Sequence, residues 1–395
     1  MAAVAAAGDR MNMAGATHRT ERTVLIIGSG IAGASTAWHL ADRGWSVTIV
    51  DDQRDGGATL AGAGIATPFT LDDQGPDWAW LMFAASQYYL DLVPRLVRPT
   101  EASRAAGHAV VGEMIIARDD HEAGQLPAAA RRIAAATQQW GDRSIGSTEL
   151  LSGDDAAHRH PLLAPVAAAL WLPLVAQVNG DLLRQRLLAG AQARGARHLA
   201  APAELRRTEA GAVSALVDGE PTRPDEIVVA AGAWTDKLLA PVGLMAGVYP
   251  QRGQLVHARI EQAVELPVIT GFGSNYLLTF DGGRSVFGPT REDSSGFDQW
   301  PTIEGVHLMI ADALELAPGL RTARWIETRS GLRPASRDGH PTIGRLTENL
   351  SVVTGFGAQG LTVGGYAGRL VADGLDSGEF AVPETFRPQR WSNPV

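Results

Sequence analysis

The sequence predicts an α/β fold, α+β overall, in which a parallel sheet flanked by helices is combined with an antiparallel sheet. Residues 23–51 alternate a short apolar strand, a glycine turn, a helix and a second strand, the order that builds parallel sheets. Residues 248–290 instead carry alternating strands joined by a hairpin turn at Asp281–Gly283. With 395 residues, 45% of them hydrophobic and 19% charged, the chain can bury a large core and hold two domains of roughly 150 residues each.

The composition excludes several kinds of chemistry. The chain has no cysteine, which rules out disulfides, thiolate metal sites, iron–sulfur clusters and cofactors attached through cysteine. Its 34 basic and 43 acidic residues give a net charge of −9, which argues against nucleic acid as a partner. The one lysine, Lys237, is followed by Leu238, so there is no Walker phosphate loop. We also expect no metal site, because His121–Glu122 begins a zinc motif that Gln125 leaves incomplete.

The N-terminal segment offers no targeting signal. Residues 1–22 are alanine-rich and irregular, and they predict a disordered tail. The uncharged stretch Val24–Trp38 is shorter than the ~20 apolar residues of a membrane span and is interrupted by glycines. We therefore expect a cytoplasmic protein whose membrane contact is at most peripheral.

The opening unit predicts a dinucleotide-binding site. The apolar run Thr23–Ile27 predicts a strand buried on both faces, and a helix follows over Ile31–Arg43, stopping at Gly44. A second buried strand, Trp45–Val50, ends in Asp51. Because the glycine pattern stands in this strand–turn–helix–strand context, it is far more specific than glycines alone.

Each residue type in this turn has a physical role. Gly28 permits the tight turn, Gly30 lets the backbone approach a pyrophosphate, and Gly33 lets the helix pack close to the sheet. The helix N-terminus supplies N–H groups and a partial positive charge for the phosphates. Asp51 can accept hydrogen bonds from a ribose diol, and its charge would repel a 2′-phosphate. The residues expected to bind the dinucleotide here are Gly28, Gly30, Ile31, Ala32, Gly33 and Asp51.

The fingerprint alone leaves NAD and FAD open, and three further segments favour FAD. Residues Gly56–Pro68 are mostly tiny, which would let the main chain lie against a flat ring system; a flexible linker is the alternative. Glu226–Trp234 predicts a buried strand leading into a glycine turn. Asn349–Thr354 predicts another strand, which opens into the second glycine turn Gly355–Gly360 and a helix over 361–373. We interpret this helix N-terminus as returning to the cofactor, where its dipole could favour a reduced flavin anion, although a glycine-rich core turn would look the same.

Taken in order, these motifs resemble the FAD-dependent D-amino-acid oxidase superfamily, which includes glycine oxidase, sarcosine oxidase-like enzymes and D-amino-acid dehydrogenases. The resemblance runs from about Thr23 to Arg390 and is specific at superfamily level, not for one substrate. The segments that carry it are Gly28–Gly33, Gly57–Pro68, Val228–Trp234, Gly331–Pro334 with Asp338–Gly344, and Gly355–Gly360.

The resemblance implies a p-hydroxybenzoate-hydroxylase-like layout. A Rossmann-like FAD domain is then interleaved with an antiparallel-sheet substrate domain, in agreement with the absence of a long linker or internal repeat. We expect the FAD domain to comprise 23–84, 160–245 and 326–395, and the substrate domain 85–159 and 246–325. Further cofactor-binding residues implied by the resemblance are Gly62, Ala63, Gly64, Ile65, Ala231, Gly232, Trp234, Gly357, Gln359, Gly360, Leu361 and Thr362.

The resemblance also implies a substrate site. Arg333 matches the family's carboxylate-binding arginine, whose fork makes two parallel hydrogen bonds; an internal salt bridge to Glu327 or Asp338 is the alternative. Tyr276 matches a tyrosine that lies over the substrate in glycine oxidase, although a sheet tyrosine can simply pack. Ile65 matches an apolar residue beside the flavin.

Three other polar residues are less specific. Arg252 and Arg291 could line the same cavity, but surface arginines are the commoner case. His340 is of the residue type that most often acts as an acid or base, yet a loop histidine more often faces solvent, so we assign no acid–base residue.

The implied reaction is oxidation of a small carboxylated amine, a D-amino acid or a glycine-like substrate. The α-hydrogen leaves as hydride to flavin N5, and the imine hydrolyses to a 2-oxo acid. Oxygen, or a quinone or electron-transfer protein, could accept the electrons. We expect noncovalent FAD, because cysteine is absent and Ala61 stands where some relatives carry a flavin-linked histidine; Lys237 lies in the wrong segment for the oxygen-activating lysine of sarcosine oxidase-like members.

Two other readings stay open at this point. An NAD-dependent dehydrogenase would share only the first βαβ unit. The chain could also be a tRNA-modifying oxidase domain or a non-catalytic flavin-binding protein, although the acidic charge speaks against the tRNA role. The sequence leaves the oligomeric state open.

Overall fold

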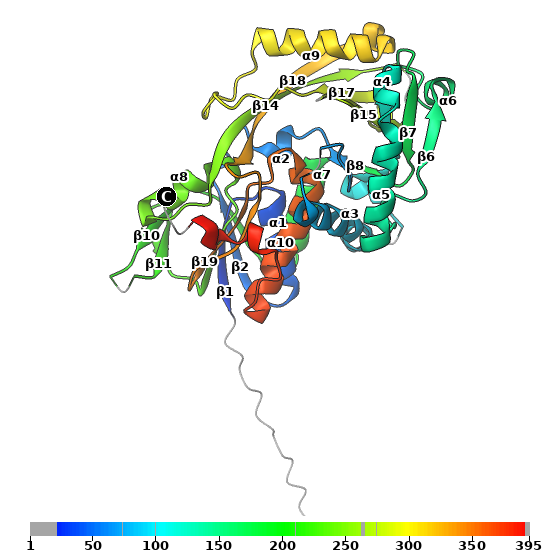
Figure 1. The fold of residues 1–395 in the computed structure, drawn as a ribbon. Helices are drawn as coiled ribbons and strands as arrows, with labels where there is room; N and C mark the ends of the chain where they lie inside the picture. The colour runs from blue at the N-terminus through cyan, green and yellow to red at the C-terminus, as the bar shows by residue number, and fades with distance from the viewer. Residues whose placement is uncertain are drawn as a thin grey trace, which may run out of the picture.

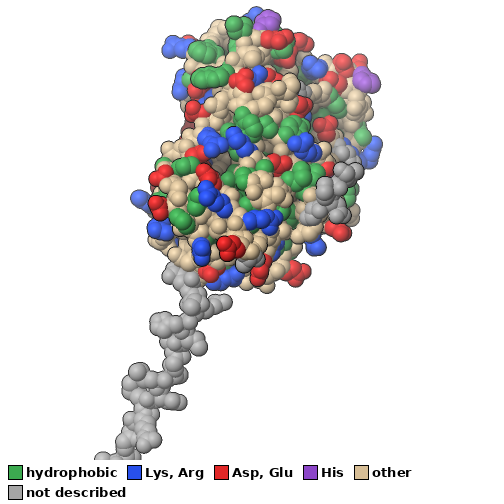
Figure 2. Space-filling view, turned by 90° about the vertical axis from the view of Figure 1, so that its left-hand side faces the viewer, with side chains coloured by type: hydrophobic (Ala, Val, Ile, Leu, Met, Phe, Trp, Pro, Cys, Tyr) green, Lys and Arg blue, Asp and Glu red, His purple; other side chains and the backbone are tan. Residues whose placement is uncertain are grey.

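The computed structural model describes residues 22–72, 74–98, 100–209, 211–261, 265–273 and 275–391 (Figure 1). The predicted tail 1–22 therefore lies outside the described residues except for Arg22, whose guanidinium lies 3.9 Å from the centre of the Trp45 ring. On the face shown in Figure 2, acidic and basic side chains are interspersed with apolar ones. Among the helices of the described ranges, none is long and apolar enough to cross a membrane.

The first layer is a sheet built from both ends of the chain. Within the described residues it has six strands in the order β19-β20-β13-β1-β2-β9. All neighbours pair in parallel except β19, which is antiparallel to β20. The strands are β1 (Thr23–Ile27), β2 (Ser46–Asp51), β9 (Arg197–Ala200), β13 (Glu226–Val229), β19 (Thr342–Thr347) and β20 (Leu350–Thr354).

Both faces of this sheet are covered, which is why its strands read as continuous apolar runs. Val24 and Ile26 point into a core formed with four helices, whereas Leu25 and Ile27 pack against a small three-stranded sheet and a short helix. The helices are α1 (Ile31–Asp42), α3 (Pro76–Leu96), α7 (Gly180–Gln192) and α10 (Gly360–Ser377) on one face and α8 (Thr235–Leu239) on the other; the small sheet comprises β10 (Ala203–Arg207), β11 (Val213–Val217) and β12 (Glu220–Thr222).

Helices α1 and α10 pack unusually close together because glycines face the contact. A Cβ on Gly368 would lie 2.5 Å from the carbonyl oxygen of Ala32, and one on Gly364 would lie 2.6 Å from the Ile31 side chain. The hydroxyl of Ser35 donates to the carbonyl of Gly365 at 2.6 Å. This contact brings the N-terminal ends of the two helices to the same edge of the sheet.

The second layer is a larger sheet, with eight strands among the described residues in the order β18-β14-β17-β16-β15-β5-β7-β6. It is antiparallel except for the β15–β5 pair. Helix α9 lies across its outer side in Figure 1, and α4, α5 and α6 lie at its other end. The elements are β5 (Glu113–Ala117), β6 (Glu149–Ser152), β7 (Ala168–Leu172), β14 (Val248–Arg259), β15 (Leu266–Gly271), β16 (Tyr276–Thr279), β17 (Arg284–Gly288), β18 (Arg324–Ser336), α4 (Asp120–Ala123), α5 (Leu126–Trp140), α6 (Gly153–Arg159) and α9 (Ile303–Leu316).

The fold class predicted from the sequence is confirmed: a Rossmann-like parallel layer is interleaved with an antiparallel one. A third small sheet, β3 (Ile65–Ala66), β8 (Ala176–Val178) and β4 (His108–Val110), lies between segments of both. Strand β7 pairs with β5 and β6, and β18 pairs with β14, so both strands belong to the eight-stranded sheet. The domain limits expected from the sequence instead place residues 160–245 and 326–395 in the FAD domain. We propose from this pairing that the substrate domain includes both strands.

Candidate active site

One cavity connects the two layers. Its volume is about 2380 Å³, and both glycine turns contribute to its wall. Ordinary small-molecule pockets measure roughly 300–1,000 Å³, so this one has room for an extended dinucleotide and a substrate together. The amino- and carboxy-terminal turns therefore face a single site, as the sequence predicts.

The amino-terminal turn places helix α1 at the cavity. Gly28 has φ +105°, and a Cβ there would lie 2.4 Å from the carbonyl oxygen of Ala230, so only glycine fits. The N-cap residue, Gly30, has no side chain to satisfy the first N–H groups, and the N–H of Ile31 donates to the Thr59 hydroxyl at 3.0 Å. The open end of this helix therefore presents partial positive charge to the cavity.

Asp51 is held at the end of β2. Its Oδ2 accepts from the backbone N–H of Ser29 at 2.6 Å and from the Ser29 hydroxyl at 2.7 Å, and its Oδ1 accepts from the N–H of Gln53 at 2.7 Å. These bonds link the carboxylate to the glycine turn and hold it at the cavity wall, where it could accept hydrogen bonds from a ribose.

The N-terminus of a second helix, α10, lies at the same cavity. Helix α10 begins at Gly360, and its N-cap residue, Gln359, makes no side-chain cap hydrogen bond. Gly62 lies against this helix, since a Cβ there would lie 2.7 Å from the Leu361 side chain. Two helix N-termini whose N-cap residues make no side-chain cap hydrogen bond therefore point into one cavity, which suits an anionic cofactor that spans both.

The structure brings nearly all the predicted residues to the cavity wall. The exceptions are Gly33, which packs against the carbonyl oxygen of Gly28, and Thr362, which is buried and donates to the carbonyl of Ile65 at 3.3 Å. Gly33 thus has the packing role that its spacing predicts, and Thr362 supports a lining residue. The residues on the wall are Gly28, Gly30, Ile31, Ala32, Asp51, Gly62, Ala63, Gly64, Ile65, Ala231, Gly232, Trp234, Tyr276, Arg333, Gly357, Gln359, Gly360 and Leu361.

Arg333 lies in the cavity without an acidic partner. Its Nη1 donates to the carbonyl oxygen of Thr290 at 3.0 Å, and no ion pair is formed with any residue of the described ranges. The two carboxylates that could have neutralised it are bound elsewhere: Glu327 pairs with Arg329 and Asp338 with Arg390. The internal salt bridge is therefore excluded, and the guanidinium is available to a ligand.

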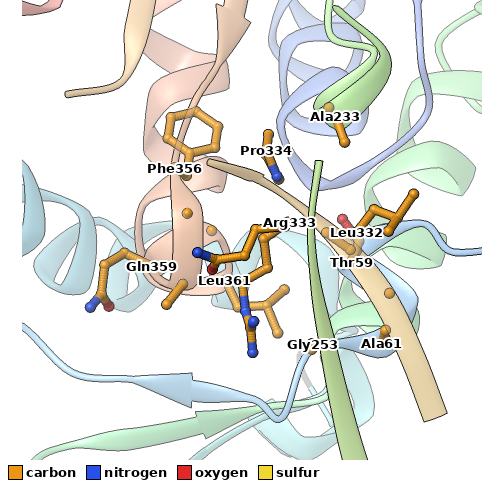
Figure 3. Close-up of a pocket in the computed structure, with 18 of the residues that line it drawn as sticks. Thr59, Ala61, Ala233, Gly253, Leu332, Arg333, Pro334, Phe356, Gln359 and Leu361 are labelled. Carbon is orange, nitrogen blue, oxygen red and sulfur yellow. The ribbon is translucent and has the colours of Figure 1, made fainter. Parts of the chain in front are cut away.

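Neighbouring strands position this guanidinium. Gly253 of β14 lies beside it, and a Cβ there would lie 2.3 Å from the guanidinium carbon. Figure 3 shows Arg333 between Gly253 on one side and Gln359 and Leu361 on the other. A hydrogen bond joins strand β18 to the glycine-rich segment 56–68 (the glycine loop), because the N–H of Leu332 donates to the carbonyl of Gly56 at 2.9 Å.

Tyr276 shares this part of the cavity. Burial raises the pKa of its hydroxyl, and the positive charge of Arg333 opposes that rise. Burial likewise lowers the pKa of the Arg333 guanidinium, while Tyr276 acts in the opposite direction. The two groups therefore lie within electrostatic range of each other, as a shared carboxylate site requires.

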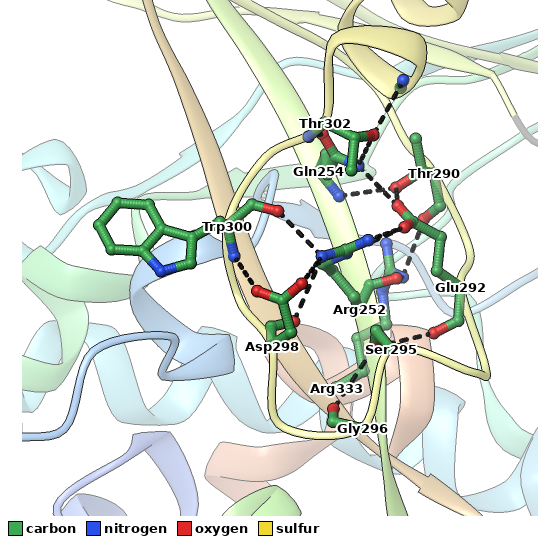
Figure 4. A network of polar contacts seen from close by, with 11 residues as sticks. Arg252, Gln254, Thr290, Glu292, Ser295, Gly296, Asp298, Trp300, Thr302 and Arg333 are labelled. Carbon is green, nitrogen blue, oxygen red and sulfur yellow. Dashed lines mark hydrogen bonds and ion pairs between the residues drawn. The ribbon is translucent and has the colours of Figure 1, made fainter.

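Arg252 has a different role from the one considered from sequence. It is neither a surface residue nor part of the cavity wall: its side chain is 8% exposed and pairs with Glu292 and with Asp298, the latter at 2.9 Å. It also donates to the carbonyl of Trp300 at 3.0 Å, so it holds the segment 289–302 in place (Figure 4). The reason is a contact between distant parts of the chain, because β14 buries this position against that segment.

Arg291 does line the cavity. His340 does not: its ring packs against Phe386 at 5.9 Å and is half-buried rather than solvent-facing.

Two residues on the wall were missed by sequence reasoning. Thr59 was interpreted only as a tiny residue in a glycine-rich run, but its hydroxyl accepts from the N–H of Ile31 at the start of α1. Glu113 is a buried carboxyl that accepts from Thr270 at 2.6 Å and Thr67 at 2.8 Å; burial raises its pKa and these bonds oppose the rise. An acidic residue directly before the apolar run Met114–Ala117 was the available signal.

The fold and the cavity are those of a dinucleotide-dependent oxidoreductase, in which two helix N-termini and the antiparallel sheet enclose a space that would hold the cofactor. The chain belongs to the family described as FAD dependent oxidoreductase, whose profile matches residues 23–374. It is thus an FAD-dependent enzyme, and the predicted membership of the D-amino-acid oxidase superfamily is confirmed. An NAD-dependent dehydrogenase that shares only the first βαβ unit does not account for a match of this length.

Individual relatives agree with this assignment. The chain is 33% identical over 356 residues to the uncharacterized oxidoreductase YurR of Bacillus subtilis, covering 89% of this chain and 94% of the relative. It is 29% identical over 357 residues to glycine oxidase of Pseudomonas aeruginosa, covering 89% and 93%. The crystal structure of iminodiacetate oxidase from Chelativorans sp. BNC1 superposes with a TM-score of 0.86 at 38% identity, covering 92% of this chain and 98% of that one.

Proposed function

We propose that the protein oxidises the CH–NH bond of a small carboxylated amine to an imine, which water then hydrolyses to a 2-oxo acid and ammonia or an amine. The observation that carries this proposal is Arg333: an unpaired guanidinium lies in the same cavity as both glycine turns. Glycine oxidase and iminodiacetate oxidase, two of the proteins this chain is similar to, bear names that fit such a substrate.

The chain's own residues would mainly bind and orient the substrate. Arg333 can hold the carboxylate through two parallel hydrogen bonds, which fixes both its charge and its direction. The Tyr276 hydroxyl can donate to the same carboxylate, and Ile65 supplies an apolar wall. When bound, FAD supplies the acceptor for the two electrons of the α-carbon–hydrogen bond.

The protonation of the amine follows from this arrangement. The nitrogen must enter neutral so that its lone pair can form the C=N bond as the α-hydrogen leaves with its electron pair. The remaining N–H proton then passes to water, and the cavity needs no dedicated base for the step. Positioning is the main contribution, and well-oriented reactants can gain roughly 7–11 kcal/mol.

The test is anaerobic bleaching of the purified, FAD-loaded protein against a panel of amines. We expect loss of the flavin absorbance with small carboxylated amines and none with the corresponding amines that lack a carboxylate. Readmitted air then identifies the acceptor: rapid recolouring means oxygen, and slow recolouring means a quinone or an electron-transfer protein. A protein that stays yellow with every carboxylated amine would overturn the proposal.

Arg333→Leu sharpens this test. We expect the variant to keep FAD, because Arg333 has no role in the glycine turns, but to raise KM for the carboxylated amine about 100-fold, since charge-assisted hydrogen bonds are lost. Arg324→Leu, at the exposed start of the same strand, is the matched control and should behave as wild type. Equal KM values for the two variants would remove Arg333 from the carboxylate site.

A further inference from the structure

A second arginine without an ion pair among the described residues lines the same cavity as Arg333. Arg291 lines the same cavity and is exposed to it. Its backbone follows directly on Thr290, whose carbonyl accepts the 3.0 Å bond from Arg333, so the two arginines reach the cavity from adjacent points. Arg291 makes no ion pair or side-chain hydrogen bond with any residue in the described part of the chain.

The acidic side chains next to Arg291 are already engaged. Glu292 accepts from Arg252, Thr290 and Gln254. Asp293 accepts from the Tyr249 hydroxyl at 3.0 Å and from Gln251 at 2.7 Å. Neither carboxylate forms an ion pair with Arg291, although the charge of Arg291 helps to lower the pKa of Asp293. The network in Figure 4 binds Glu292 to Arg252, Thr290 and Gln254.

The charge of Arg291 is felt at the substrate site. It opposes the burial-driven rise of the Tyr276 pKa, and it adds to the burial-driven lowering of the Arg333 pKa. The two arginines carry like charges and form no ion pair with any described residue, although Glu292 and Asp293 act on them at longer range. A ligand with two negative groups therefore gains more from this site than a ligand with one.

We infer that Arg291 forms a second carboxylate subsite and that the substrate is an amine bearing two carboxylates, one held by Arg333 and the other by Arg291. This rests on the proposed amine oxidation and adds the substrate class to it. A substrate with one carboxylate would leave Arg291 solvated, and Arg291 would then not help to position the substrate.

The first experiment measures binding without turnover. The probe is diglycolate, a diacid in which an ether oxygen replaces the amine nitrogen, and methoxyacetate is the same molecule with one carboxylate fewer. Their dissociation constants for the FAD-loaded protein are read from the shift of the flavin absorbance and checked by calorimetry. We expect diglycolate to bind at least 10-fold more tightly than methoxyacetate.

The variants assign that preference to one side chain. Arg291→Gln should weaken diglycolate about 10- to 100-fold and change methoxyacetate less than threefold, whereas Arg291→Lys should recover part of the loss because it keeps the charge. Arg321→Gln, an exposed arginine outside the cavity wall, is the matched control for loss of charge. Unaltered FAD absorbance and melting temperature of each variant show that the cavity is intact.

The outcomes separate the two proposals. Equal affinities for diglycolate and methoxyacetate, or an Arg291→Gln loss that is the same for both, would overturn the second subsite while leaving amine oxidation standing. A diacid preference that depends on Arg291, in a protein that oxidises no amine, would support the subsite and overturn the proposed reaction. In turnover, we expect kcat/KM for iminodiacetate over N-methylglycine to fall at least 10-fold in Arg291→Gln.

Discussion

At the scale of single residues, the site depends on two glycines, whose lack of a side chain leaves room for the residues packed against them. Gly253 and Gly331 face each other across the β14–β18 pair. A Cβ on Gly253 would enter the space of the Arg333 guanidinium, and one on Gly331 would lie 2.4 Å from the Cβ of Ala61. These two glycines let the arginine lie flat on its own sheet and let that sheet approach the glycine loop.

We therefore predict that Gly253→Ala impairs substrate binding without unfolding the protein. The backbone of Gly253 does not have a positive φ, so alanine fits, and the end of the Arg333 side chain is what must move. A displacement near 1 Å can cost about 100-fold in kcat/KM, whereas FAD content should be unchanged. The measurement is kcat/KM for the carboxylated amine, together with the flavin-to-protein absorbance ratio.

Gly124→Ala is the control, because a Cβ there meets only ordinary contacts. If Gly253→Ala retains wild-type kcat/KM, Arg333 does not hold the carboxylate from this position.

The sequence identified the residues whose role is local and missed those whose role depends on burial. Gly28 and Asp51 were predictable, because one turn and the strand after it fix their surroundings. Arg252 was not, because the groups that bury it, Glu292 and Asp298, lie about 40 residues away and nothing in the local pattern pairs them. Arg291 belongs to the same kind: only the cavity distinguishes it from a surface arginine.

At the scale of elements, the same contrast holds between helices and sheets. The predicted helix over 31–43 is observed as α1, Ile31–Asp42, and the one over 361–373 as α10, Gly360–Ser377, because a helix-forming stretch bounded by glycines is a local signal. The partners of β18 were not predictable, because β14 lies about 75 residues earlier in the chain and the pairing is stabilised only in the folded sheet.

The close contact of α1 with α10 leads to a prediction on stability and FAD affinity together. Gly368→Ala inserts a methyl group 2.5 Å from the carbonyl oxygen of Ala32, a backbone atom that cannot yield cheaply. We expect a loss of about 1–3 kcal/mol in the free energy of unfolding and weaker FAD binding, since the helix N-termini move apart. Urea unfolding of the apoprotein and FAD titration measure the two effects.

Gly365→Ala provides the control on the same helix. A Cβ at Gly365 meets the Tyr89 hydroxyl at 3.5 Å, an ordinary contact, so alanine should be neutral or stabilise the helix by up to about 1 kcal/mol. Equal effects of the two substitutions would mean that α10 does not need its glycine contact to reach the cofactor.

At the scale of the whole molecule, the cores on both layers contain buried histidines. Burial lowers the pKa of His39 to about 3 and the pKa values of His108, His160 and His257 to about 4. They lie on α1, on β4, after α6 and on β14, so they report on the parallel layer, the small sheet and the antiparallel layer alike. Each is neutral when folded at pH 7.

The sign of the pH dependence follows from proton uptake on unfolding. Between the unfolded pKa of about 6.5 and the folded values near 4, the unfolded chain binds more protons than the folded one, so the free energy of unfolding falls as pH decreases through this window. Above pH 6.5 these histidines contribute no slope. We expect a loss on the order of 2 kcal/mol for each fully buried histidine between pH 7 and pH 4.

His160 isolates the effect, because it is 0% exposed and neither ring nitrogen has a hydrogen-bond partner within the described residues. His160→Leu should flatten the curve of unfolding free energy against pH between 6.5 and 4, whatever it does to stability at pH 7, since one proton-binding site is removed from the unfolded chain. His121→Gln, on the exposed α4 helix, is the control. Urea unfolding at half-unit pH steps measures the slope; if His160→Leu and wild type run parallel throughout, His160 is not buried as a neutral imidazole, and the antiparallel layer is packed more loosely around it than the structure shows.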